Sequence, residues 1–273
     1  MERSVWTGVA AGVDPGRLGE ARTQVQNAIH WLARIANSYA TPEPDQRHLW
    51  LSFDPARRAF VTCPVGDGVT VELRLPALEF QFREAGRPVP HILNVEGHTP
   101  AKVEAWVLVE LLHRGIDRDR FSKALPYAPA NLMSGDNVEY SPESLVREIE
   151  ALSQWLASGE RAVMRLAREL APERAAEAQL LCWPDQLHVG VLLPPGLDGT
   201  APATPLRIGM STGDERYAEP YFFVAAQRGA EIETPHPGAV LTASRIAADG
   251  LDEDQVVAAL RAAVATTRRR LAN

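Results

Sequence analysis

Hydrophobic residues recur at the spacing of an α-helix in several stretches of the chain, and two of them lie in the first half. The first stretch predicts a helix over 17–39, which ends where prolines begin to recur in 41–46. Thr99 and Pro100 have the residue types of an N-cap and a first helical position. We therefore predict a second helix over 100–113.

The second half of the chain begins and ends with helical patterns. Ser141 and Pro142 mark the start of a helix, which we expect to break or bend at Ser158–Gly159. Asp252 and Gln255 have the spacing of a capping box, so the last helix begins there. The arginines at its end suit the negative end of the helix dipole and need no ligand.

Alternating hydrophobic and polar residues predict a run of strands between the first two helices. Asp54 and Pro55 suit a type I turn between two of these strands. The predicted strands are 48–53, 58–65, 69–76 and 78–82. Because the connections between them are short, we predict an antiparallel meander with one covered face.

The second half repeats the order of helix followed by strands. Its candidate strands are 179–183, 187–194, 205–210, 220–226 and 239–244. We predict an α+β fold with antiparallel sheet covered by helices. The repeated order suggests two similar lobes, 1–135 and 136–273, which together form one compact unit.

A histidine near the start of one strand is the first candidate for chemistry. The two-residue period of 187–194 places Val189 and Val191 on one face, so His188 points to the other, beside Gly190. Trp183 and Asp185 flank a proline, which marks a strand start, an edge or a bulge. We expect the His188 ring to look away from the packed interior and to share a recess with an acidic turn.

That acidic turn lies in 211–220 and leads into a strand that begins with aromatic residues. If this strand and His188 belong to one sheet, acids and a tyrosine gather near the imidazole. We predict a ligand-binding cleft made by six residues: Trp183, Asp185, His188, Asp214, Glu219 and Tyr221. The competing interpretation is structural, with a packed histidine and acids that only shape the turn.

Charge and motifs exclude several function classes. The net charge of −7 argues against nucleic acid as a partner, because a phosphate backbone requires clustered Lys and Arg. The two cysteines, Cys63 and Cys182, form no metal-ligand motif, and we predict no metal and no cofactor. No nucleophile elbow, P-loop or dinucleotide-binding fingerprint is present, which excludes the standard serine hydrolases and nucleotide-dependent enzymes.

The sequence also predicts the cellular location of the protein. The start of the chain has too short an apolar stretch for a signal peptide, and no run approaches the roughly 20 apolar residues of a membrane span. We therefore predict a cytoplasmic protein with no membrane partner.

Three segments resemble a family of uncharacterised bacterial proteins that carries a domain of unknown function. They are the motifs at 182–190 and 209–224 and the strand that follows the first helix. In that family a Trp-Pro step is commonly followed by paired histidines, an aromatic residue and an aspartate. Here Asp185 and His188 stand in exchanged order after Trp183 and Pro184. An acid–imidazole couple could survive this exchange, whereas a two-histidine ligand set could not.

We predict that the protein binds a small polar molecule in the cleft around His188, as a binding protein or as an enzyme. Trp183 would supply an apolar wall, His188 with a carboxylate would orient or move a proton, and Tyr221 would donate a hydrogen bond. The alternative is a non-catalytic interaction or scaffold protein with no small-molecule site. In that case exposed apolar surface would mediate contacts such as a homodimer.

Overall fold

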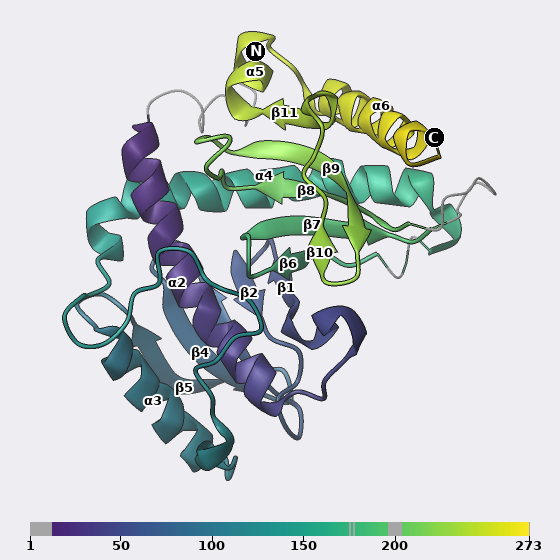
Figure 1. Cartoon of the computed structure of the whole chain (residues 1–273). Helices are drawn as coiled ribbons and strands as arrows, with labels where there is room; N and C mark the ends of the chain where they lie inside the picture. Colours follow the sequence, from purple (N-terminus) through teal and green to yellow (C-terminus); the bar gives the residue numbers. More distant parts are fainter. Residues whose placement is uncertain (1–12, 175, 177, 196–203, 273) are drawn as a thin grey trace. The chain divides into compact units, whose positions relative to one another are not determined.

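The computed structural model describes residues 13–174, 176, 178–195 and 204–272 (Figure 1). By its internal contacts the chain forms two compact units. The N-terminal unit comprises Gly16–Ser153 and Cys182–Asp185, and the C-terminal unit comprises Gln154–Leu181 and the chain from Gln186 onward. The units divide inside the helix α4 (Val146–Leu170). The two similar lobes, 1–135 and 136–273, stay a prediction.

The N-terminal unit contains the two helices that the first half of the sequence predicts. Helix α2 spans Pro15–Tyr39 and buries most of its second half. Helix α3 spans Pro100–His113, and the Thr99 side chain accepts a hydrogen bond from the Lys102 amide, as an N-cap residue does. Both predictions are confirmed. Three short 3₁₀ helices lie around them: η1 (Pro44–Leu49), η2 (Arg118–Arg120) and η3 (Pro142–Leu145).

The strands of this unit form an antiparallel meander, as the sequence predicts. They are β1 (Leu51–Asp54), β2 (Ala59–Val61), β3 (Val69–Arg74), β4 (Glu79–Glu84) and β5 (Arg87–Asn94), with β6 (Leu181–Trp183) next to β1. The strand predicted over 48–53 begins too early, because His48 and Leu49 end η1 instead. The turn after β1 is closed by Asp54, whose carboxylate accepts the Arg57 amide at 3.0 Å.

Strand β5 is missing from the predicted elements. It carries Pro88 and Pro90 among its eight residues, and proline has no N–H to offer a sheet. The sequence therefore reads as a loop, although β5 pairs with β4 and ends the described strand order. A strand at the end of a sheet tolerates proline, because only one of its sides is paired.

The two faces of this meander differ in chemistry. Phe60, Leu73 and Phe80 lie opposite one another and are fully buried, and Trp106 of α3 packs near Phe80. Glu72 lies on the other face and is also buried. Its carboxylate is surrounded by three guanidinium groups, those of Arg57, Arg74 and Arg83, at 3.5, 3.8 and 3.3 Å. The polar face is thus covered by arginine side chains.

The C-terminal unit contains the rest of α4, helix α6 (Glu253–Ala272) and further antiparallel strands of the same sheet. Its main strands are β7 (His188–Leu193), β8 (Leu206–Ser211) and β9 (Tyr221–Arg228), and β9 also pairs with β10 (Glu231–Ile232) and β11 (Val240–Thr242). Smaller helical elements are η4 (Pro172–Arg174), η5 (Pro237–Ala239) and α5 (Ala243–Ala248). Asp252 and Gln255 exchange the hydrogen bonds of the predicted capping box.

The break predicted at Ser158–Gly159 is wrong, since α4 continues to Leu170. Gly159 has another purpose. A Cβ at this position would lie 2.0 Å from Sδ of Met210 on β8 and 3.2 Å from the ring of Phe222 on β9. The glycine therefore lets the helix approach the sheet closely, a role that periodicity does not reveal.

The fold class is confirmed: helices pack with antiparallel sheet in an α+β arrangement. Among the described helices, none has the length and apolar composition needed to cross a membrane.

Candidate functional site

His188, the centre of the predicted cleft, begins β7. It lies opposite Ser211 of β8, which lies opposite Tyr221 of β9, so these three side chains share one face of the sheet. The predicted phase is therefore confirmed. The predicted recess is wrong, because the ring is 5% exposed and lies 4.5 Å from the ring of Phe223. Periodicity gives the face of a side chain, and it does not show whether that face is covered.

The surroundings of His188 keep its imidazole neutral. Burial lowers the pKa of His188 to about 3, helped by the positive charge of Arg207 and opposed by Asp214. Its Nδ1 has no hydrogen-bond partner among the described residues. A ligand cannot reach a ring that is packed against aromatic side chains. The neutral imidazole of His188 therefore cannot exchange a proton with a ligand. The geometry is that of a core histidine.

Asp214 organises the acidic turn. One carboxylate oxygen accepts the backbone N–H groups of Arg216 and Tyr217, both at 2.8 Å. The other accepts the phenol of Tyr221 at 2.5 Å. Burial, and then the hydrogen bond to Asp214, raise the pKa of Tyr221. Both oxygens of Asp214 are thus used within the protein.

Glu219 caps a helix. Its carboxylate accepts the Ser244 amide at 2.6 Å and the Ser244 hydroxyl at 2.7 Å, at the start of α5. A negative charge at a helix N-terminus is stabilising because the unpaired amides there carry partial positive charge. This contact explains why an acidic residue stands at position 219, and no ligand is needed to explain it.

Trp183 and Asp185 belong to the N-terminal unit. The Trp183 ring lies 5.7 Å from that of Trp50 in an edge-to-face arrangement, and the Asp185 carbonyl accepts the Gln26 side chain at 2.9 Å. The structure thus brings three of the six predicted residues together, namely His188, Asp214 and Tyr221. The other three predicted residues, Trp183, Asp185 and Glu219, make the separate contacts described above.

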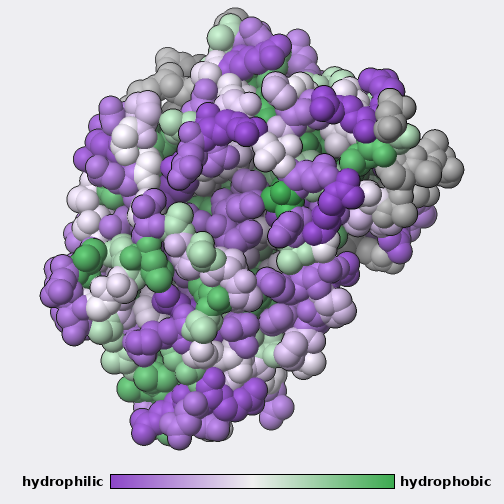
Figure 2. Space-filling model, viewed as in Figure 1, coloured by the Kyte–Doolittle hydropathy of each residue, from purple (hydrophilic) through white to green (hydrophobic). Residues whose placement is uncertain are grey.

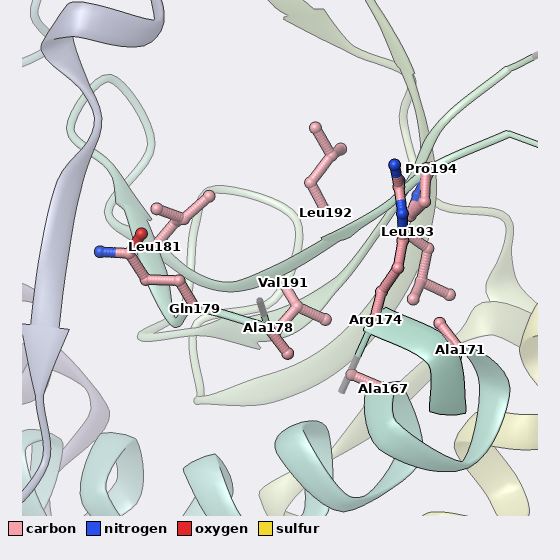
Figure 3. Close-up of a pocket in the computed structure, with 10 residues that line it drawn as sticks. All are labelled: Ala167, Ala171, Arg174, Ala178, Gln179, Leu181, Val191, Leu192, Leu193 and Pro194. Carbon is pink, nitrogen blue, oxygen red and sulfur yellow. The ribbon is translucent and has the colours of Figure 1, made fainter. Parts of the chain in front are cut away.

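A pocket of about 200 Å³ lies elsewhere in the C-terminal unit, where α4 ends (Figure 3). Its walls are mostly aliphatic, and two polar side chains join them. Figure 3 shows Gln179 beside Leu181 on one side and Arg174 beside Pro194 on the other. The lining residues are Ala167, Ala171, Arg174, Ala178, Gln179, Leu181, Val191, Leu192, Leu193 and Pro194.

A group of side chains suited to a metal ion lies in the N-terminal unit. Nδ1 of His91 on β5 is 3.0 Å from Oε1 of Glu110, and Nδ1 of His113 is 3.6 Å from the same oxygen. The three ligand atoms all lie within 4.8 Å of one another. Among the residues that the structure describes, this is the one group of three with such spacing.

Sequence reasoning missed both the pocket and this group. Glu110 and His113 are three residues apart on α3, and that spacing places both on one helix face, which is a readable signal. His91 lies on β5, the strand that its prolines concealed, so its approach to α3 could not be anticipated. The pocket is made by aliphatic residues from separate segments, and such residues carry no recognisable motif.

Comparison with known proteins gives no match: no family model, curated protein or solved structure is significantly similar to this chain. The resemblance to a family of uncharacterised bacterial proteins therefore stays a prediction. The function has to be argued from the residues of this chain.

Proposed function

We propose that the protein binds a small molecule that has an aliphatic part and an anionic group, in the pocket at the end of α4. This keeps the kind of function expected from the sequence and moves the site away from His188. The reason for the move is access. His188 is enclosed by aromatic rings, and both oxygens of Asp214 are held by the turn and by Tyr221.

The lining of the pocket carries this proposal. Leucine, valine and alanine side chains form its walls, and they favour an apolar ligand surface. The Arg174 guanidinium can hold a carboxylate through two parallel hydrogen bonds, and Gln179 offers a further amide. The volume of about 200 Å³ is below the roughly 300–1,000 Å³ of pockets for drug-sized molecules, which favours a short-chain acid.

Three matched probes test the pocket: hexanoate, hexanol and acetate. Hexanoate has both the chain and the charge, whereas each of the others lacks one of them. We expect hexanoate to bind with a Kd near or below about 1 mM and to shift the NMR signals of Ala171, Val191 and Leu193. The other two should bind at least about tenfold more weakly.

Two arginine variants distinguish binding in the pocket from nonspecific attraction of an anion to positive charge. Arg174→Gln should weaken hexanoate binding about tenfold or more and leave hexanol binding unchanged. Arg168→Gln is the matched control, since Arg168 is exposed on α4 and does not line the pocket. If hexanoate shifts none of the lining residues, or if both variants behave alike, this pocket is not the ligand site.

A second candidate function is protein interaction, which one observation favours. Ile92 of β5 and Val109 and Leu112 of α3 are large apolar side chains that are 48%, 47% and 54% exposed. Figure 2 shows hydrophobic residues gathering at the lower left, over α3. Exposed apolar groups that cluster are typical of a contact surface.

Light scattering across a concentration series tests this second candidate with a second copy of the chain as the partner. A dimer that dissociates in the double variant Val109→Ser, Leu112→Ser would support it. A monomer at all concentrations would remove self-association as the reason for the exposed side chains.

A further inference from the structure

We propose that His91, Glu110 and His113 form a binding site for a divalent transition-metal ion such as zinc. This site lies in the N-terminal unit and is independent of the pocket at the end of α4. Its three side chains come from two elements: His91 from β5, and Glu110 and His113 from α3. The ligands would be the two Nδ1 atoms and Oε1 of the carboxylate.

The distances between the ligand atoms fit one shared ion. Zinc bonds to imidazole nitrogen and carboxylate oxygen are about 2.0–2.2 Å long, so two ligands of a tetrahedral zinc lie roughly 3.4 Å apart. The observed separations from Oε1 of Glu110 are 3.0 Å to His91 and 3.6 Å to His113. These two values lie on either side of that spacing, and the largest separation in the group is within 4.8 Å. Small rotations of the two imidazoles would complete the geometry.

The carboxylate is held in place before any ion arrives. Glu110 is 2% exposed, and its other oxygen, Oε2, accepts Nη1 of Arg114 at 2.8 Å. Arg114 is itself fixed by Glu84 at 3.1 Å and by the ring of Phe82, 4.4 Å from the guanidinium carbon. Groups of this kind, one shell behind the ligands, orient a carboxylate and lower the entropic cost of binding. Glu84 also offsets the positive charge that Arg114 brings close to the ion.

The donor set selects the kind of ion. Two imidazoles and one carboxylate suit zinc, nickel or copper, whereas calcium and magnesium prefer oxygen ligands alone. The side chains of His91 and His113 are 61% and 53% exposed, so an ion can reach them from solvent. Three protein ligands leave a fourth position for water, which is the arrangement of an open site.

Calorimetric titration of the full chain, prepared without a histidine tag, with zinc chloride tests the proposal. We expect one ion per chain with a Kd below about 10 µM. His91→Ala and His113→Ala should each weaken binding at least about tenfold, since even the loss of an outer-shell partner costs 10- to 100-fold. Because both histidines are exposed, each variant should fold, and circular dichroism checks this.

Two controls keep the result specific. His98→Ala removes a histidine of the same unit whose Nδ1 contacts the Glu96 carbonyl, and it should bind zinc as the parent protein does. Cys63→Ser removes a partly exposed thiol that also attracts zinc, and it too should leave binding unchanged. Absence of binding below about 100 µM would overturn the proposal. So would binding that survives in both His91→Ala and His113→Ala.

Discussion

The protein contains two groupings of histidine and carboxylate that differ in access. In the C-terminal unit His188 is buried against Phe223, and the nearby Asp214 is occupied by its own turn and by Tyr221. In the N-terminal unit the carboxylate of Glu110 is buried and the two imidazoles are exposed. One grouping has an enclosed base and a satisfied acid, and the other has an enclosed acid and accessible bases.

This difference shows that the identity of the residues does not decide whether they bind a ligand. A buried neutral imidazole contributes packing, because desolvation disfavours its charged form and the neighbouring rings exclude solvent. Exposed imidazoles beside a fixed carboxylate can be reached from solvent, and an ion would replace the Nδ1 proton that His91 donates to Glu110 in its absence. The comparison therefore predicts that changes at His188 alter stability, whereas changes at His91 and His113 alter ligand binding.

The largest expected effect is on folding. His188→Ala should lower the free energy of unfolding by about 2–3 kcal/mol, because it leaves a cavity beside Phe223. His91→Ala should change the same quantity by no more than about 0.5 kcal/mol, since it is a surface substitution. Urea denaturation of the two variants measures both values. Equal losses would remove the distinction between the two groupings.

The next effect is the dependence of stability on pH. Burial lowers the pKa of His188 to about 3 and that of His30 to about 4, below the usual 6.5 that applies in the unfolded chain. At a pH between the folded and the unfolded pKa values, the unfolded state binds more protons than the folded state. The free energy of unfolding is therefore highest above pH 6.5 and decreases as the pH falls toward 4. The slope should be on the order of 1 kcal/mol per pH unit for each histidine.

The variant His188→Phe isolates one of the two contributions. It keeps an aromatic ring against Phe223 and cannot titrate, so urea unfolding between pH 7 and pH 5 should show a slope smaller than that of the parent by roughly 1 kcal/mol per pH unit. An unchanged slope in the variant would mean that His188 does not contribute to the loss of stability in acid.

The smallest effect concerns the acidic turn. Tyr221→Phe removes the hydroxyl that donates to Asp214 and should lower the free energy of unfolding by about 1–2 kcal/mol. Tyr217→Phe is the matched control, because Asp214 accepts the backbone amide of Tyr217 and the variant keeps it. Thermal unfolding compares the two. A larger loss in Tyr217→Phe would contradict the role assigned to the Tyr221 hydroxyl.

Local signals in the sequence predicted much of the fold. The helices are marked by caps that act within four residues, as at Thr99 and Asp252, and the antiparallel strands by short turns. Two errors have a tertiary cause. The Ser158–Gly159 pair predicts a break or a bend, because its close approach to Met210 involves a distant strand that local sequence does not show. The prolines of β5 predict a loop, although the end of a sheet tolerates them.

The candidate site was less accessible to sequence reasoning. The two-residue period correctly placed His188 on the face opposite Val189 and Val191. The structure adds Ser211 and Tyr221 to that face, and burial depends on what covers it. Asp214 and Glu219 are candidates because of their charge, and hydrogen bonds within the protein account for both. Asp214 accepts backbone amides of its own turn, and Glu219 accepts the amide of Ser244, 25 residues further along the chain. Convergence of His91 with Glu110 depends on the pairing of β5, which no local pattern shows.

The prolines of β5 also limit how copies of this protein can associate. With no N–H at positions 88 and 90, the free side of β5 cannot supply the regular ladder of donors that an incoming strand would need. Open-ended stacking of molecules through this border is therefore disfavoured, even at high concentration. Any assembly that uses this part of the surface therefore has to rely on contacts between side chains.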